Sequence, residues 1–387
     1  MHRFDDEQRR VRLGRRHLLA PSARVTSVVA AADAVVALHA TDAATVYLSV
    51  CARLADPGVG AVERALYEEV SLVRLLSMRN TLFAMSRDVA PAVDASNARS
   101  VASRERLKLL KHLQEDGKGL DDRWLAETEE QTCAALTALG HATGSELSAV
   151  VPALRTKITV FPGTKQETVQ GVASRVIRVL AADGRIRRGR PRGSWTSSQF
   201  RWTTAEPWPP VDPSAARNEV TKRWLLSYGP GTEGDLKWWT GWSVRETRAA
   251  LAAVGAEEVL LDSGAIGRVA PGDTTDEALT EPWAALLPGL DPSAMGWADR
   301  GFQLPAGHRA ALFDRAGNIG PTVWWNGGIV GGWAQRADGE LVWRLLSEVG
   351  GDAAQLIEAE AARLSAWVGD SRITPRFRTP LERELTA

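Results

Sequence analysis

The sequence predicts a mainly helical fold with small β-hairpins, followed by a β-rich C-terminal part. Two observations lead to this prediction. Through Val254, amphipathic helical segments come in groups of three, and each group ends in two short strand-like runs. Beyond Pro282 the chain is rich in short apolar runs separated by turn residues such as Asn326-Gly327-Gly328. The repeated order indicates tandem units of one kind.

The first unit, residues 1–120, begins with a basic N-terminal region. Val and Ala interiors and the Asp56-Pro57-Gly58 stop predict helices at 26–38, 43–54 and 59–69. Two apolar runs at 72–76 and 82–85 predict a hairpin, and a further helix is expected at 101–114. Three helices followed by a hairpin is the order of a winged helix, a variant of the helix-turn-helix.

The second unit, residues 121–208, repeats this order, with helices expected at 121–139, from Gly144 onward and at 168–183. Its hairpin carries five arginines in eight positions: Arg185, Arg187, Arg188, Arg190 and Arg192. A charge run of this kind is usually a solvated face. In the wing position, beside Gly and Pro, it fits phosphate contact equally well, and the sequence leaves both interpretations open.

The third unit and the β-rich part occupy residues 214–387, after a Pro-rich linker at 207–213. Helices are expected at 216–228, 232–240 and 243–254, the last opened by a capping box of Ser243 and Glu246. Strands are expected at 259–261 and 266–269, and a meander at 322–326, 329–335 and 341–345. A closing helix at 353–368 precedes a tail that is expected to be flexible from Arg372.

Composition excludes several classes of protein. The formal net charge is zero, so any nucleic-acid binding must use local patches. Two cysteines and six scattered histidines give no disulfide framework and no metal spacing, and the cysteine usage suggests a reducing compartment. We find no secretory signal, no membrane span, no phosphate-binding loop and no dinucleotide motif, and we expect neither metal nor cofactor.

The polar segment His39–Asp42 is the candidate reaction site. It lies between two predicted helices, and Asp42 stands where an N-cap of the second helix is expected. If the segment is extended, His39 and Thr41 lie on the same side, because side chains alternate along extended chain. Asp before a helix is most often only a cap, and that interpretation stands beside the chemical one.

The chain resembles the winged-helix DNA glycosylases of the AlkZ/YcaQ type. The motifs that carry the resemblance, in order, are LHATD at 38–42, MRNTL at 78–82, LSYGPGT at 226–232, WWTG at 238–241, LLPGLD at 286–291 and PTVWWNGGIVGGW at 321–333. The family's reactive motif is Gln–apolar–Gln or Gln–apolar–Asp, and His39, Ala40 and Thr41 occupy those positions here. At the second motif the family often continues with His, where this chain has Phe83.

The resemblance implies cleavage of the N-glycosidic bond of alkylated purines in double-stranded DNA, including purines in interstrand crosslinks. Such a protein would act in DNA repair or in self-resistance to a genotoxin. It would be a bacterial, cytoplasmic, nucleoid-associated monomer, and it would be a monofunctional glycosylase. Asp42 would stabilise the oxocarbenium-like sugar, and His39 and Thr41 would position water or the carboxylate. Five arginines are expected to contact DNA: Arg79, Arg187, Arg188, Arg190 and Arg192. The alternative is a winged-helix DNA-binding protein without catalytic activity.

Overall fold

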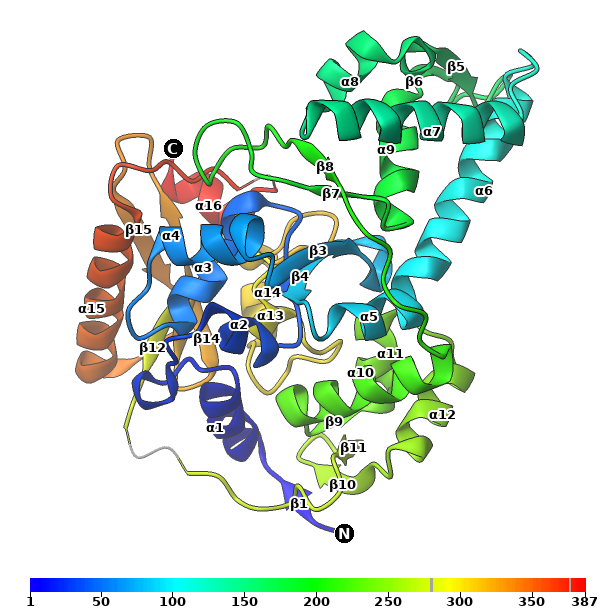
Figure 1. Ribbon diagram of the computed structural model, residues 1–387. Coiled ribbons are helices and arrows are strands. Elements are labelled where there is room, and N and C mark those ends of the chain that lie inside the picture. Colours follow the sequence, from blue (N-terminus) through cyan, green and yellow to red (C-terminus); the bar gives the residue numbers. More distant parts are fainter. Residues whose placement is uncertain (279–280, 376) are drawn as a thin grey trace.

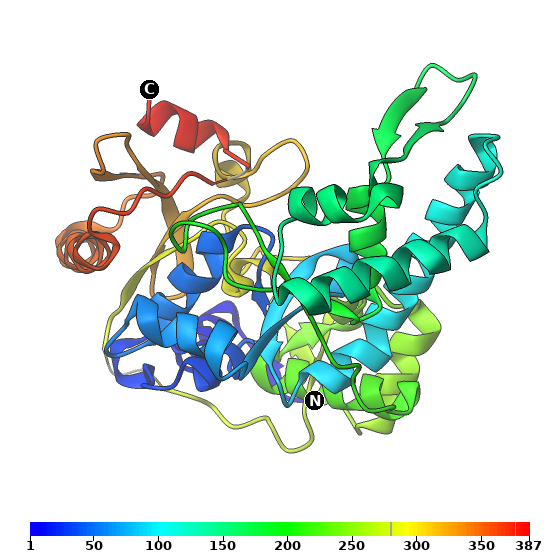
Figure 2. The same cartoon turned by 45° about the horizontal axis from the view of Figure 1, so that its top comes forward.

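The computed structural model describes residues 1–278, 281–375 and 377–387. Helices dominate, and the strands form small sheets of two to four members (Figure 1). A central segment, residues 99–204, projects from a body that is built from both ends of the chain. Figure 2 shows the same arrangement from a second side, with one hairpin at the outer end of the central segment. The predicted combination of helices with small hairpins is therefore observed.

The N-terminal part supplies a three-stranded sheet, in the order β2-β4-β3, and the helices around it. Its elements are β1 (Arg3–Phe4), α1 (Asp6–Arg16), α2 (Val28–Asp33), β2 (Leu38–His39), α3 (Ala43–Arg53), α4 (Val59–Glu63), β3 (Leu72–Leu76), β4 (Leu82–Ser86) and α5 (Ala90–Val93). The hairpin and the start of α3 after Asp42 are confirmed. The helix expected at 26–38 ends at Asp33, because Val36 takes a positive φ of 61° and the next residues pair with β4 instead.

The central segment has a hydrophobic core of its own, drawn from residues between Leu109 and Ile186. Its elements are α6 (Arg99–Glu115), α7 (Asp122–Leu139), α8 (Gly144–Val150), β5 (Lys157–Val160), β6 (Thr168–Gly171), α9 (Ala173–Ala182), β7 (Ile186–Arg188) and β8 (Trp202–Thr204). The expectation of a helix over all of 168–183 was wrong for 168–171. Those residues pair with β5, an antiparallel partner that helical patterning does not reveal.

The third group of helices ends in a four-stranded sheet in the order β1-β10-β11-β9. Its elements are α10 (Pro213–Tyr228), β9 (Gly231–Thr232), α11 (Glu233–Thr240), α12 (Val244–Ala253), β10 (Glu257–Leu261) and β11 (Ile266–Val269). The capping box of Ser243 and Glu246 is confirmed. Strand β1 pairs in parallel with β10, so the start of the chain is fixed to the sheet of this group.

The C-terminal part is a four-stranded sheet with helices on its flanks. Its elements are β12 (Ala284–Leu287), α13 (Pro292–Met295), α14 (Arg309–Leu312), β13 (Thr322–Trp325), β14 (Gly328–Gln335), β15 (Leu341–Leu345), α15 (Gly350–Val368) and α16 (Pro380–Leu385). The predicted meander is confirmed, and β12 adds a fourth strand to it. The expectation of a flexible tail was wrong for 380–385, because Leu381 and Leu385 of α16 are buried in the main core.

Helix α3 is fixed to the C-terminal part by a buried ion pair. Arg53 at the end of α3 and Asp291 before α13 lie 2.8 Å apart, and both side chains are 0% exposed. A second guanidinium nitrogen of Arg53 donates to the other carboxylate oxygen at 2.9 Å, so the contact is bidentate. Since α3 follows directly on His39–Asp42, this pair helps to set the position of the candidate reaction segment.

Candidate nucleic-acid interface

A groove of about 1020 Å³ lies between hairpin β3–β4 and the central segment. Six basic side chains line it, against one acidic side chain, Glu105. The basic residues are Arg74, Lys108, Arg175, Arg178, Arg187 and Arg188. A chain with no net charge therefore concentrates cations along one concave surface, the electrostatic pattern that favours a polyanion.

Two of the predicted DNA-binding arginines, Arg187 and Arg188, lie in this groove on strand β7. Arg187 forms no ion pair with a carboxylate among the described residues. Burial, and then the charge of Arg87, lowers its pKa. The guanidinium of Arg188 stacks on Phe200, 3.9 Å from the ring centroid. Both side chains are thus held at the groove by the hairpin β7–β8.

The other two arginines of the same hairpin are paired with glutamates. Arg190 lies 2.6 Å from Glu63 and 2.9 Å from Glu68, and Arg192 pairs with Glu146. Neither Arg190 nor Arg192 is among the residues that line the groove. A phosphate at these two cations would compete with a carboxylate, so the hairpin divides into two pairs with different surroundings.

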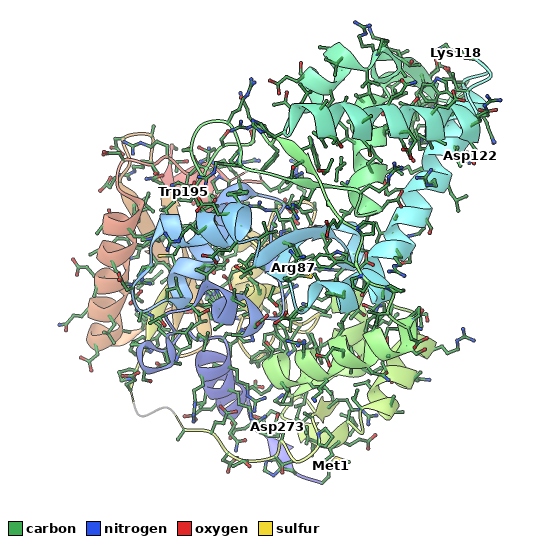
Figure 3. The ribbon with its side chains drawn as sticks, in the orientation of Figure 1. Met1, Arg87, Lys118, Asp122, Trp195 and Asp273 are labelled. Carbon is green, nitrogen blue, oxygen red and sulfur yellow. The ribbon has the colours of Figure 1, made fainter. Side chains whose placement is uncertain are left out.

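The loop between β7 and β8, residues 189–201, reaches from the central segment to the body; we call it the strap. Its Trp195 is only 6% exposed and lies between Tyr47 and Trp367, with ring centroids 5.2 and 5.3 Å away. The indole N–H donates to Ser371 Oγ at 3.2 Å. Figure 3 shows Trp195 where the strap meets the body. The central segment is therefore tied to the body by a buried aromatic anchor.

His39 is buried beneath the groove. It is 4% exposed, lies edge-on to Phe83 at 5.1 Å between ring centroids, and pairs with it across β2 and β4. Its Nδ1 is buried and has no hydrogen-bond partner among the described residues. Burial, and then the charge of Arg79, lowers the pKa of His39 to about 3, so the imidazole is neutral at pH 7.

Thr41 lies at the groove itself, on its lining. Its Oγ1 is buried and makes no hydrogen bond within the described part of the chain. Buried hydroxyls almost always have a partner, so an unpaired one beside a basic groove is a candidate ligand contact. Of the three predicted catalytic residues, Thr41 is the one that the structure brings to the groove.

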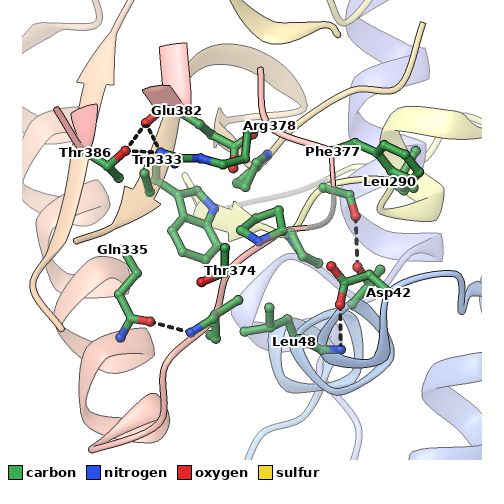
Figure 4. A pocket seen from close by; sticks show the side chains of 18 of the residues that line it. Asp42, Leu48, Leu290, Trp333, Gln335, Thr374, Phe377, Arg378, Glu382 and Thr386 are labelled. Atoms are coloured by element: carbon green, nitrogen blue, oxygen red, sulfur yellow. Dashed lines mark hydrogen bonds between the residues drawn. The ribbon is translucent and has the colours of Figure 1, made fainter. Parts of the chain in front are cut away.

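Asp42 lines a second, smaller cavity of about 260 Å³ instead. Its carboxylate accepts a bond from Ala44 N at 3.1 Å, as an N-cap does. Across this cavity lies Glu382 of α16 (Figure 4), whose pKa is raised by burial, with a contribution from the charge of Asp42. The structure thus confirms the capping position of Asp42 but does not bring His39, Thr41 and Asp42 to one surface.

Arg79, the fifth predicted DNA contact, lies in the turn between β3 and β4. Its guanidinium stacks on Trp238 of α11 at 4.0 Å from the ring centroid, and its backbone has a positive φ of 51°. Asn80 and Thr81, the next two residues, line the groove. The arrangement places a cation beside the groove rather than inside it.

Sequence reasoning missed four of the groove's cations: Arg74, Lys108, Arg175 and Arg178. Arg175 and Arg178 are three positions apart on α9 and therefore share a helix face, a spacing visible in the sequence. Arg74 lies on β3 and Lys108 on α6, and nothing local indicates that these two elements face each other.

Among the described residues, no helix is both long and apolar enough to cross a membrane. In the same residues, no three His, Cys, Asp or Glu side chains gather as metal ligands would. No curated protein matches the chain. The DNA glycosylase AlkZ of Streptomyces sahachiroi has a similar structure, with a TM-score of 0.72 and 22% sequence identity over 97% of this chain and 99% of that one.

The family model described as "DNA glycosylase AlkZ-like" matches residues 32–367, which include the groove, the strap and the reaction segment. Because that match covers most of the chain, the protein belongs to the AlkZ-like DNA glycosylase family.

Proposed function

We propose that the protein hydrolyses the N-glycosidic bond of alkylated purines in double-stranded DNA. The observation that carries this proposal is the meeting of six basic side chains and the unpaired hydroxyl of Thr41 in one groove. The cations suit the phosphates of a duplex, and the hydroxyl gives the groove a polar group at the segment that corresponds to the family's reactive motif.

The three helical groups with their hairpins would act as tandem winged helices, with boundaries near 1–120, 121–208 and 214–387. The hairpins β3–β4, β7–β8 and β10–β11 occupy the wing positions of these units. In this arrangement the β3–β4 and β7–β8 hairpins border the groove. The predicted phosphate contacts are Arg187 and Arg188 in the groove and Arg79 beside it. We further propose that Arg190 and Arg192 exchange their glutamates for phosphates when the duplex binds.

The chemistry needs little besides charge and positioned water. An N7- or N3-alkylated purine is a cationic leaving group, so its departure requires no general acid. The sugar that remains is oxocarbenium-like and is stabilised by nearby negative charge. We assign water positioning to Thr41 and electrostatic stabilisation to Asp42, which acts through space from the neighbouring cavity. Neutral His39 would hold the segment His39–Asp42 in place. Water would be the nucleophile, as in a monofunctional glycosylase, and the enzyme would act as a monomer.

Base release from a duplex containing N7-methylguanine tests the proposal directly. The wild-type protein should leave abasic sites, and Thr41→Val, which removes the hydroxyl at nearly constant volume, should slow their formation. The matched control is Thr137→Val on the exposed face of α7. A crosslinked duplex in the same assay would show whether unhooking belongs to the activity. Absence of base release from either substrate by the wild-type protein would exclude the glycosylase assignment.

One observation favours a second function, that of a DNA-binding protein without catalysis. The carboxylate of Asp42 caps α3 and faces the smaller cavity, and His39 is buried, so two of three expected groups lie away from the groove. Such a protein would bind duplex DNA with an affinity that falls as salt rises, and it would release no base. The same assay, run beside a binding measurement, separates the two functions.

A further inference from the structure

Two guanidinium groups from distant parts of the chain lie against the indole ring of Trp238 on α11. The Cζ of Arg79, in the β3–β4 turn, lies 4.0 Å from the ring centroid, and that of Arg300, after α13, lies 4.9 Å from it. Gly241 ends α11 in a left-handed conformation, and a Cβ there would lie 3.5 Å from the Arg79 backbone. Both cations therefore lie against one aromatic ring, and the charge of Arg79 lowers the pKa of Arg300.

Within the described residues, neither cation has an ion-pair partner. Arg300 is 8% exposed and its Nε is buried without a hydrogen bond, as is Nε of Arg79. The only side-chain hydrogen bond of Arg300 in that part of the chain is a 3.7 Å contact to the sulfur of Met295. Burial lowers the pKa of each guanidinium to about 10, so both remain charged at neutral pH. Unpaired, desolvated cations of this kind favour an anion strongly.

The carboxylate whose charge acts on Arg300, that of Asp235, is already engaged. One of its oxygens accepts bonds from the backbone N–H of Ala298 and Asp299 at 2.9 and 3.1 Å, and the other caps α11 at Thr232. Its charge raises the pKa of Arg300, but by less than burial and the charges of Arg79 and Arg309 lower it. The anion that completes the cluster is therefore not supplied by Asp235.

A third arginine lies near Arg79 and Arg300 and is exposed to solvent. Arg309 of α14 is exposed, and its Cζ lies 4.6 Å from the ring centroid of Phe313. Arg300 approaches the same ring at 5.6 Å, and the charge of Arg309 lowers the pKa of Arg300. Of the three cations, Arg309 is thus exposed, Arg79 half-buried and Arg300 buried.

We propose that Arg79, Arg300 and Arg309 form a binding site for one phosphate group of a nucleic-acid backbone. The site adjoins the groove, because Asn80 and Thr81 line it directly after Arg79. It also adjoins the reaction segment, because the charge of Arg79 acts on His39. This assignment rests on the proposed function, and it gives that function a fixed anchor for the strand that carries the damaged base. Planar guanidinium groups bind phosphate oxygens in pairs, which fixes orientation as well as position.

Inorganic phosphate is the first probe, because its binding requires no catalysis. At constant ionic strength, phosphate in place of chloride should raise the thermal unfolding midpoint of the wild-type protein, as any ligand of the native state does. Arg300→Gln should abolish this increase. The control Arg315→Gln removes the same charge at an exposed position after α14 and should retain it. A wild-type protein that phosphate does not stabilise, or an Arg300→Gln variant that it stabilises equally, would overturn the site.

An unmodified duplex is the second probe and identifies the source of the phosphate. The slope of log K against log salt should become shallower by about one unit in Arg300→Gln and stay unchanged in Arg315→Gln. A phosphate response without a change of slope would assign the site to free phosphate and overturn the backbone assignment. If Arg300→Gln does not fold, Arg79→Gln takes its place in both measurements. Neither probe depends on base release. Both measurements would therefore still test the phosphate site if the protein proved to have no glycosylase activity.

Discussion

Asp42 has a structural role that can be separated from any chemical one. As the N-cap of α3 it accepts a bond from Ala44 N, and Asn caps a helix about as well as Asp. Asp42→Asn should therefore leave thermal stability and duplex affinity nearly intact. If the carboxylate stabilises the transition state, base release should fall by about two to three powers of ten, or about 3–4 kcal/mol. Single-turnover release of N7-methylguanine measures this. Equal rates in variant and parent would reduce Asp42 to a cap.

His39 makes stability depend on pH. Its pKa is about 3 in the folded protein and about 6.5 when unfolded, so between these values the unfolded chain binds one more proton. The contribution of neutral His39 to the free energy of unfolding is then fully present above about pH 6.5. It decreases as the pH falls, by about 1.4 kcal/mol for each pH unit. Urea unfolding at pH 7 and pH 5 should show a smaller loss for His39→Gln than for wild type. Exposed His141→Gln is the control and should keep the wild-type loss.

At the scale of elements, the hairpin β7–β8 offers an internal comparison. Arg187 and Arg188 lie in the groove, whereas Arg190 and Arg192 are paired with glutamates. Replacing the first two by Gln should make the salt dependence of duplex binding shallower by about two units. Replacing the second two should change it less, because their charge is already partly neutralised by glutamates. Equal changes of slope for the two double variants would show that all four arginines reach phosphate.

The strap supports a different prediction. Trp195 is its buried anchor, and removal of a buried Trp side chain typically costs about 3–5 kcal/mol. In Trp195→Ala that loss should fall mainly on the docking of residues 189–201 and less on the separate core of the central segment. Amide hydrogen exchange should therefore become faster in the strap and around Tyr47 and stay slow in α7. Unchanged exchange in the strap would show that the other strap contacts hold it without Trp195.

Local signals predicted some elements, and long-range pairing decided the others. The cap at Asp42, the capping box at Ser243 and the hairpin β3–β4 depend on neighbouring residues, and each lies where the sequence placed it. Strands β2 and β6 were missed because each exists through a partner strand. The candidate site shows the same division. Thr41 was named from its motif, whereas Arg74 and Lys108 meet only after β3 and α6 pack.

At the scale of the whole molecule, the buried ion pair of Arg53 and Asp291 joins the N-terminal part to the C-terminal part. Asp291→Asn would leave Arg53 charged and unpaired at a position with no exposure, a change that typically costs about 3–5 kcal/mol. Urea unfolding should show this loss. The double variant Arg53→Met with Asp291→Leu should recover most of it, because apolar side chains of similar volume often replace a buried pair. A single variant as stable as wild type would mean that water reaches the pair.

The same pair has a consequence for synthesis on the ribosome. The lining of the groove is complete in sequence at Trp202, well before the counterion of Arg53 has been translated. Helix α3 therefore cannot be buried as in the finished protein until Asp291 has left the exit tunnel. The smaller cavity beside Asp42 also requires residues up to Thr386. A premature stop codon between these points yields a chain with all the groove residues but an uncompensated charge under the reaction segment. We expect quality-control proteases to degrade such a product.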